Sequence, residues 1–167
     1  TIGGRRSAIF LTRDNLIGLD PATGAIHFQR RWRARNASSV NAATPLVVGD
    51  SIFVSAQYGP GAAVLRVEGS KLADVWASDE AMSNHYATSV YHDGHLYGFH
   101  GRQEFGPSLR AVEFKAGTVK WSQDQFRAGS VTLAGDKLLM MRESGEMLRA
   151  PASPQALARP SPCPRRG

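Results

Sequence analysis

The chain has 167 residues, 42% of them hydrophobic, and 20 Lys and Arg against 14 Asp and Glu give it a net charge of +6. This length indicates one domain with a buried core, and the lack of any run near 18 apolar residues excludes a membrane-spanning helix. Residues 149–167 hold four arginines and no acid, so without them the net charge falls to +2, which indicates no specific nucleic-acid partner.

Two kinds of marker recur along the chain with nearly one period. Trp32, Trp76 and Trp121 are separated by 44 and 45 residues. Turn-forming pairs between apolar runs recur 44 and 42 residues apart, at Gly49-Asp50, Asp93-Gly94 and Gly135-Asp136. Repeats of this length, built from short strands and hairpin turns, are typical of β-propellers. The sequence therefore predicts an all-β fold with the three tryptophans buried at equivalent places on successive blades.

The apolar runs predict four blades in chain order: a partial blade at 1–32, blades at 40–78 and 85–123, and a partial blade at 127–149. The first has strands at 7–12, 15–20 and 25–30 and lacks the innermost strand. The second has strands at 44–48, 51–56, 62–67 and 73–78. The third has strands at 86–91, 95–99, 108–113 and 118–123, and the fourth at 129–134, 137–142 and 145–149. We expect about 14 strands, almost no helix, and an open arc instead of a closed ring.

Two turns share a further pattern. Asp20 and Gly24 precede Phe28, and Gly117 precedes Trp121, so that the aromatic follows the glycine by four residues in both turns. The glycine supplies a positive φ, and the acid accepts bonds from nearby backbone N–H groups. The pattern Leu-Asp-x-x-Thr-Gly-x-x-x-aromatic resembles the pyrroloquinoline-quinone (PQQ)-like, or quinoprotein alcohol dehydrogenase-like, β-propeller repeat family. The stretches 41–50 and 84–90 resemble the bacterial PQQ-binding-like β-propeller repeat proteins in particular.

The resemblance covers about residues 1–149. It implies that the chain forms about 3–4 blades, each with four strands, of a propeller that commonly has seven or eight blades. The family includes quinoprotein alcohol dehydrogenases and the periplasmic lipoprotein that scaffolds outer-membrane barrel assembly. It therefore implies a bacterial protein of the periplasm or the cell exterior. Because the sequence opens inside a predicted strand, we interpret the chain as a segment of a larger protein.

The best candidate site lies at the starts of the innermost strands. Alignment of the blades on their turn pairs places Asn41, His85 and Arg127 at one equivalent position. Such positions face the central channel of a propeller, so we expect these side chains to ring one mouth of the channel and to bind a ligand or partner there. The alternative is that they are polar only because the channel holds water.

Other residues offer little chemistry. His92 and His95 flank a hairpin turn without a carboxylate or cysteine at ligand spacing, which favours a solvated turn over a metal site. The resemblance to quinoprotein dehydrogenases implies adjacent cysteines under the quinone, whereas this chain has only Cys163. Asp79 and Glu80, on the connection between the second and third blades, could approach a cofactor, but most acids in such connections are solvated loop residues. We expect no catalytic residue and no metal, and neither PQQ nor calcium in this chain.

Two classes of function follow. The first is a non-catalytic propeller module for binding or scaffolding, and the alternative is part of a PQQ-dependent dehydrogenase. The expected partner is a protein or small ligand at the channel mouth or at the loops 57–61 and 100–107, and exposed blade edges favour self-association.

Residues 150–167 break the repeat. The stretch 151–167 holds five of the nine prolines and few large apolar residues, so we expect it to be disordered. Its Ala, Pro, Arg and Ser composition suggests either a genuine tail or a frameshifted reading of a GC-rich gene.

Overall fold

The computed structural model describes residues 1–37 and 41–163, and these form an all-β fold of four antiparallel sheets. The first sheet contains β1 (Ala8–Leu11), β2 (Asn15–Leu19) and β3 (Ile26–Arg31). The second contains β4 (Leu46–Val48), β5 (Ser51–Ala56), β6 (Gly61–Glu68) and β7 (Lys71–Ser78). The third contains β8 (Val90–His92), β9 (His95–His100), β10 (Ser108–Glu113) and β11 (Val119–Gln123), and the fourth β12 (Gly129–Ala134), β13 (Lys137–Arg142), β14 (Met147–Pro151) and β15 (Ser161–Pro162).

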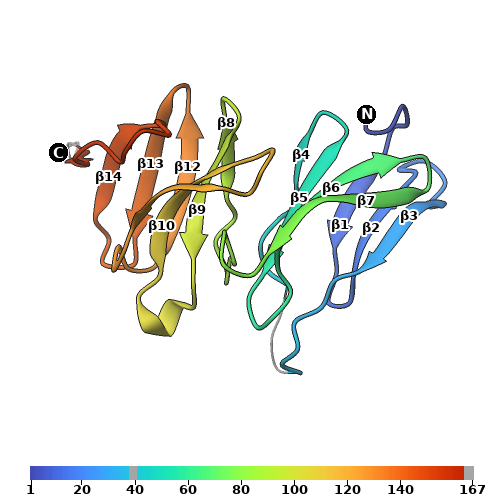
Figure 1. The fold of residues 1–167 in the computed structure, drawn as a ribbon, viewed down its shortest axis with the longest axis horizontal. Coiled ribbons are helices and arrows are strands. Elements are labelled where there is room, and N and C mark those ends of the chain that lie inside the picture. The colour runs from blue at the N-terminus through green and yellow to red at the C-terminus, as the bar shows by residue number, and fades with distance from the viewer. Residues whose placement is uncertain (38–40, 164–167) are drawn as a thin grey trace.

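The sheets stand side by side in chain order along the long axis, with the first and the fourth at opposite ends of an open arc (Figure 1). Within each sheet the strands pair with their sequence neighbours, and the first sheet has no strand in the place that β4, β8 and β12 occupy elsewhere. Over the described residues the only helical segment is η1 (Gln103–Phe105). The predicted fold class is confirmed, including the missing inner strand.

Alternation along each strand directs apolar side chains to both faces of the inner sheets. Ile52, Val54 and Leu65 of the second sheet pack with the first sheet in one cluster. Phe53 and Val64, on the opposite face, pack with Leu96 and Val112 of the third sheet in another. A third cluster joins the third and fourth sheets. Because strand side chains alternate with period 2, this two-sided burial produces the runs of consecutive apolar residues seen in β5 and β6.

Two of the three innermost strands, β4 and β8, are shorter than predicted. The sequence suggests strands at 44–48 and 86–91, whereas β4 and β8 begin two and four residues later. The difference has a local cause: the Thr44 N–H donates to the Thr88 hydroxyl of the next sheet at 3.0 Å instead of to a strand in its own sheet. The residues before β4 and β8 therefore connect the second sheet to the third.

The three tryptophans do not occupy equivalent places, which corrects the sequence interpretation. Strand register pairs Val64 with Trp76 and Ala111 with Trp121, and the matching pair in the first sheet is Gly18 with Phe28. Trp32 follows the end of β3 and is buried at 6% exposure, whereas Trp76 and Trp121 are half-buried. The 44-residue spacing from Trp32 to Trp76 is thus a coincidence, and the turn pattern that ends in Phe28 marks the true repeat.

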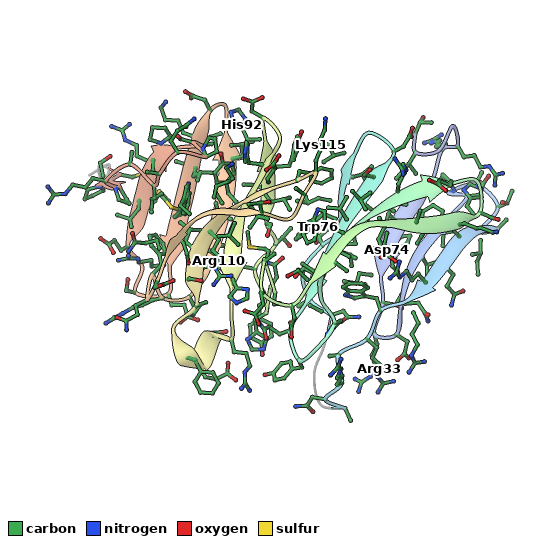
Figure 2. The ribbon with its side chains drawn as sticks, viewed as in Figure 1. Arg33, Asp74, Trp76, His92, Arg110 and Lys115 are labelled. Atoms are coloured by element: carbon green, nitrogen blue, oxygen red, sulfur yellow. The ribbon has the colours of Figure 1, made fainter. Side chains whose placement is uncertain are left out.

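The equivalent tryptophans tie each sheet to the next. Trp76 lies on the side of β7 that faces the third sheet (Figure 2), and its Nε1–H donates to the Phe114 carbonyl at 2.7 Å. Trp121 donates in the same way to the carbonyl of Ser153, at 2.8 Å. Gly117 is required beside Trp76, because a Cβ at this glycine would lie 2.7 Å from the indole ring. Each of these two indoles therefore donates to a backbone carbonyl in a turn of the following sheet.

Residues 150–163 differ from the expectation of a disordered tail. Pro151 ends β14, Ser161 and Pro162 pair with Arg149 and Leu148, and Leu157 packs against the cluster between the third and fourth sheets. The segment supplies the outer strand that the sequence interpretation leaves out of the fourth sheet. The physical reason is that the Trp121 Nε1–H donates to the Ser153 carbonyl and the edge of β14 pairs with β15, and composition alone reveals neither contact. The rest of the predicted tail, 164–167, lies outside the described residues.

Candidate functional site

One side of the arc carries the loop between β1 and β2, the equivalent loops between the second and third strands of the four-stranded sheets, and the connections that enter each following sheet. In Figure 1 this loop face is the lower side, where η1 and the loop between β5 and β6 project. The opposite side, the upper one in Figure 1, carries the tight turns, including Asp93-Gly94 between β8 and β9. The three candidate residues precede β4, β8 and β12 and therefore belong to the connections of the loop face.

Asn41 fastens the second sheet to the first. Its Nδ2 group donates to the carbonyls of Trp32 at 2.7 Å and Thr12 at 2.8 Å, and it also reaches the Arg13 carbonyl at 3.2 Å. These contacts occupy the amide donors with backbone groups of the first sheet. The geometry gives Asn41 a structural task, because its donors are already engaged within the chain.

A buried polar network fixes the connection that carries His85. Asn84 is fully buried, and its Nδ2 donates to the Phe99 carbonyl at 2.8 Å and to Ser89 Oγ at 3.1 Å. The Asn84 N–H donates to Ser55 Oγ at 2.8 Å, and the Ser83 N–H donates to His100 Nδ1 at 3.0 Å. Sequence analysis gave Asn84 no role, because its neighbours Ser83 and His85 are also polar and nothing in this stretch indicates that the amide is buried.

Arg110 of β10 binds the backbone of the same connection, which joins β7 to β8. Its guanidinium donates to the carbonyls of Glu80 and Ala81, the latter at 3.1 Å (Figure 2). Burial lowers the pKa of Arg110 from its usual value, and nearby Asp124 and Glu80 oppose that shift. The backbone of the connection is thus anchored on two sides, and satisfied buried networks of this kind rigidify the groups that they hold.

His85 sits where two loops meet. The Gln103 N–H donates to His85 Nδ1 at 3.2 Å, which places the ring proton on Nε2, 3.3 Å from the Tyr58 hydroxyl. The ring stacks on Tyr86 with centroids 3.8 Å apart and meets Tyr58 edge-on at 5.4 Å. Burial lowers the pKa of His85 and outweighs the opposing effect of the Glu104 carboxylate, 3.6 Å from Nδ1. His85 therefore joins these two loops through hydrogen bonds at both of its ring nitrogens.

Arg127 differs from the other two candidates. It is exposed, has a φ of 72°, and lies just before the strand β12. Within residues 1–37 and 41–163, no hydrogen bond or ion pair joins Asn41, His85 and Arg127 to one another. Their shared role at a channel mouth stays a prediction. His85 has hydrogen bonds at both ring nitrogens and also contacts two aromatic rings.

A pocket of about 410 Å³ opens beside His85, between the third and fourth sheets. Apolar groups form much of its wall, and polar side chains stand at intervals around it. It is lined by His85, Tyr86, Ala87, Phe99, Gly101, Gln103, Pro107, Ala128, Gly129, Ser130, Met141, Arg142 and Glu143. The guanidinium of Arg142 stacks over Phe126 at 4.3 Å and pairs with Glu146 at 2.8 Å. A concave, mostly apolar site with a few placed polar groups is typical of ligand pockets.

One exposed aromatic ring, Tyr86, lines this pocket, and another, Phe105, lies in η1, whose residue Gln103 also lines it. Tyr86 is 53% exposed and Phe105 is 71% exposed. The Arg102 guanidinium lies 4.5 Å from the centroid of Phe105 and 5.2 Å from that of Tyr58. We call Tyr58, Tyr86, Arg102 and Phe105 the aromatic rim. Tyrosine and arginine are enriched among the residues that dominate binding energy at protein interfaces.

The histidine turn at the opposite end has a different character. His95 Nδ1 bonds to the Asp93 carbonyl of its own turn at 2.8 Å. The described residues contain no group of three or more His, Cys, Asp or Glu side chains arranged to hold a metal ion. Over the same residues, no helix is long and apolar enough to cross a membrane.

Acidification is expected to destabilise the protein through His85 and His100. Burial is the main cause that lowers both pKa values below 6.5. Between each lowered pKa and 6.5 the unfolded chain binds more protons than the folded one, so the free energy of unfolding decreases as the pH falls through this window. Urea unfolding at pH 7.5 and pH 5.5 measures the effect. The double variant His85→Gln/His100→Gln should lose much of the pH dependence, while His92→Gln should retain it.

Four radially adjacent antiparallel sheets, each tied to the next by an outer-strand aromatic, define an incomplete β-propeller with each sheet as a blade. The sequence matches no protein-family profile and no curated protein. Among solved structures, the chain is similar to BamB from Moraxella catarrhalis, with 20% identity and a TM-score of 0.59 over 87% of this chain and 43% of that one.

Other propellers give a comparable likeness. The quinohemoprotein alcohol dehydrogenase from Comamonas testosteroni has 10% identity and a TM-score of 0.64, over 93% of this chain and 33% of that one. The computationally designed Ika8 protein has 10% identity and a TM-score of 0.64, over 94% of this chain and 46% of that one. At these identities the likeness establishes the propeller fold of the chain, which spans less than half the length of each of the three.

Proposed function

We propose that the chain is a non-catalytic β-propeller module of a larger bacterial protein, and that it binds a protein partner at the loop face. The observation that carries the proposal is the pocket beside His85 together with the aromatic rim. A loop of a partner protein would place an apolar side chain in the pocket and lay its backbone against Tyr86 and Phe105. The rim supplies large contact area with few rotatable bonds, which limits the entropy lost on binding.

The surroundings of His85 support binding more than catalysis. Both ring nitrogens are engaged, one by the Gln103 N–H and the other by Tyr58, so neither is available to move a proton of a substrate. Asn41 has its donors engaged in the same manner. Arg127 is the exposed member of the three and is proposed to contact the partner from the fourth blade.

A random peptide library displayed on phage tests the proposal directly. We expect peptides with a central apolar residue to be enriched on the wild-type chain. Their binding should weaken at least tenfold in Phe105→Ala and Tyr86→Ala, and less in Arg127→Ala. Val119→Ala, an exposed apolar site on β11 away from the loop face, is the matched control. Enrichment that is indifferent to both rim substitutions would contradict the proposal.

The second candidate, part of a PQQ-dependent dehydrogenase, rests on the fold shared with quinohemoprotein alcohol dehydrogenases. Addition of PQQ and Ca²⁺, followed by visible spectroscopy and a dye-reduction assay with a primary alcohol, distinguishes the two. A protein-bound quinone spectrum with dye reduction would favour the dehydrogenase. Unchanged spectra together with rim-dependent peptide binding would favour the module.

A further inference from the structure

The two end blades each leave one face uncovered. On the first blade, Ile9 and Leu11 pack toward the second blade, so alternation directs Phe10 to the opposite face. Ile26, which pairs with Leu19, belongs to this outer face as well. Phe10 is 51% exposed and Ile26 is 59% exposed. The N-terminal end of the arc therefore presents apolar side chains that no other part of the described chain covers.

The fourth blade presents the counterpart. Leu138 and Met140 are fully buried against the third blade, which directs Leu139 and Met141 to the outer side. Met147 pairs with Met141 and shares that side; the two are 41% and 39% exposed. Four of the nine large hydrophobic side chains that are exposed among the described residues thus lie on the two end faces.

Strand register shows that these faces are the two halves of one recurring interface. Ile9, Phe53, Tyr97 and Leu139 occupy equivalent places, opposite Gly18, Val64, Ala111 and Arg149. Where a following blade exists, this position packs against the residues equivalent to Ala8 and Phe10: Ile52 and Val54 in the second blade, Leu138 and Met140 in the fourth. Leu139 is thus built to receive the face that carries Ala8 and Phe10.

One chain cannot join its own two faces, because they lie at opposite ends of the arc (Figure 1). Two copies can do so. Each covers 46% of the designed Ika8 chain and 43% of BamB, so a pair supplies about the length of one such propeller. We propose that, for the 167-residue polypeptide in the absence of further blades, two copies close head to tail into a ring, with the fourth blade of each copy packed on the first blade of the other. This arrangement has two-fold symmetry and makes the same contact twice.

The mass of the 167-residue chain in solution tests the proposal. At tens of micromolar, light scattering should give twice the 18.1 kDa mass of one chain. Phe10→Glu and Leu139→Glu should each restore the single-chain mass, since a buried unpaired carboxylate is costly at either half of the contact. Val75→Glu is the control, since Val75 is 40% exposed on β7 of an inner blade and should leave the mass doubled. A wild-type chain of single mass, or larger open assemblies, would overturn the proposal.

Cross-linking tests which faces meet, without reliance on a disruptive variant. In a Cys163→Ser background, chains with Phe10→Cys are mixed with chains with Leu139→Cys and treated with a short bismaleimide, whose reach suits faces about 10 Å apart. The mixture should give a cross-linked dimer, and each variant alone should not. A dimer formed by Phe10→Cys alone would show a same-face pairing and contradict the head-to-tail ring.

Discussion

Replacing Trp76 by alanine should lower the free energy of unfolding by about 3 kcal/mol. This value lies at the low end of the destabilisation measured when a core tryptophan is replaced by alanine, because the Trp76 ring is only half-buried. The indole contacts Phe53 in a tilted arrangement at a centroid distance of 6.3 Å, and its Nε1–H donates to the Phe114 carbonyl of the next blade. The substitution removes both and opens a gap beside Gly117. Urea unfolding followed by circular dichroism measures the change.

Trp76→Phe separates the two contributions. It keeps an aromatic ring on Phe53 but leaves the Phe114 carbonyl without its donor, so we expect a loss of about 1 kcal/mol. Trp121→Ala should resemble Trp76→Ala, because Trp121 makes the same contact with Ser153. Losses under about 1 kcal/mol in both alanine variants would mean that the outer-strand aromatics do not hold the blades together.

The second large effect is expected at Gly18. A Cβ added there would lie 2.2 Å from Cζ of Phe28 and 2.5 Å from its Cε2. Phe28 is buried at 3% exposure in the cluster between the first two blades, so its ring cannot move away freely. Gly18→Ala should therefore cost about 1–3 kcal/mol through overpacking.

A double-mutant cycle checks this explanation. Phe28→Leu shortens the opposing side chain, so Gly18→Ala/Phe28→Leu should be less destabilised than the sum of the two single variants. Simple additivity would indicate that the cost of Gly18→Ala arises in the backbone and not from the ring. Thermal or urea unfolding of the four proteins at one pH provides the comparison.

The repeat could be predicted from the sequence because its strongest signals are local. Turn pairs such as Asp93-Gly94 and the acid-glycine-aromatic turns require particular backbone conformations, and each has a direct residue signature. Strands β5, β12 and β13 match their predicted bounds for the same reason, since a hairpin turn fixes both its flanking strands. Trp32 misled the alignment because tryptophan spacing alone carries no information about strand register.

The site was harder to predict because its geometry depends on contacts between distant segments. The position of His85 is set by Tyr58, Gln103 and the buried Asn84, which are up to 27 residues away in the sequence. The engagement of Asn41 by the carbonyls of Thr12 and Trp32 is likewise invisible to pattern analysis, because backbone carbonyls carry no residue signature. The outer strand of the fourth blade escaped for the same reason, since its partners are backbone groups of β14.

The direction of the tryptophan contacts has a consequence for synthesis on the ribosome. Trp76 can form its hydrogen bond only after Phe114, 38 residues later, has been synthesised. Trp121 likewise requires Ser153, 32 residues later. At translation rates of about 5–20 residues per second, each outer strand spends roughly 2–8 seconds without the turn that secures it. A nascent blade therefore has an unsecured outer edge until its successor emerges, and the molecule acquires its rigidity in steps from the N-terminal end.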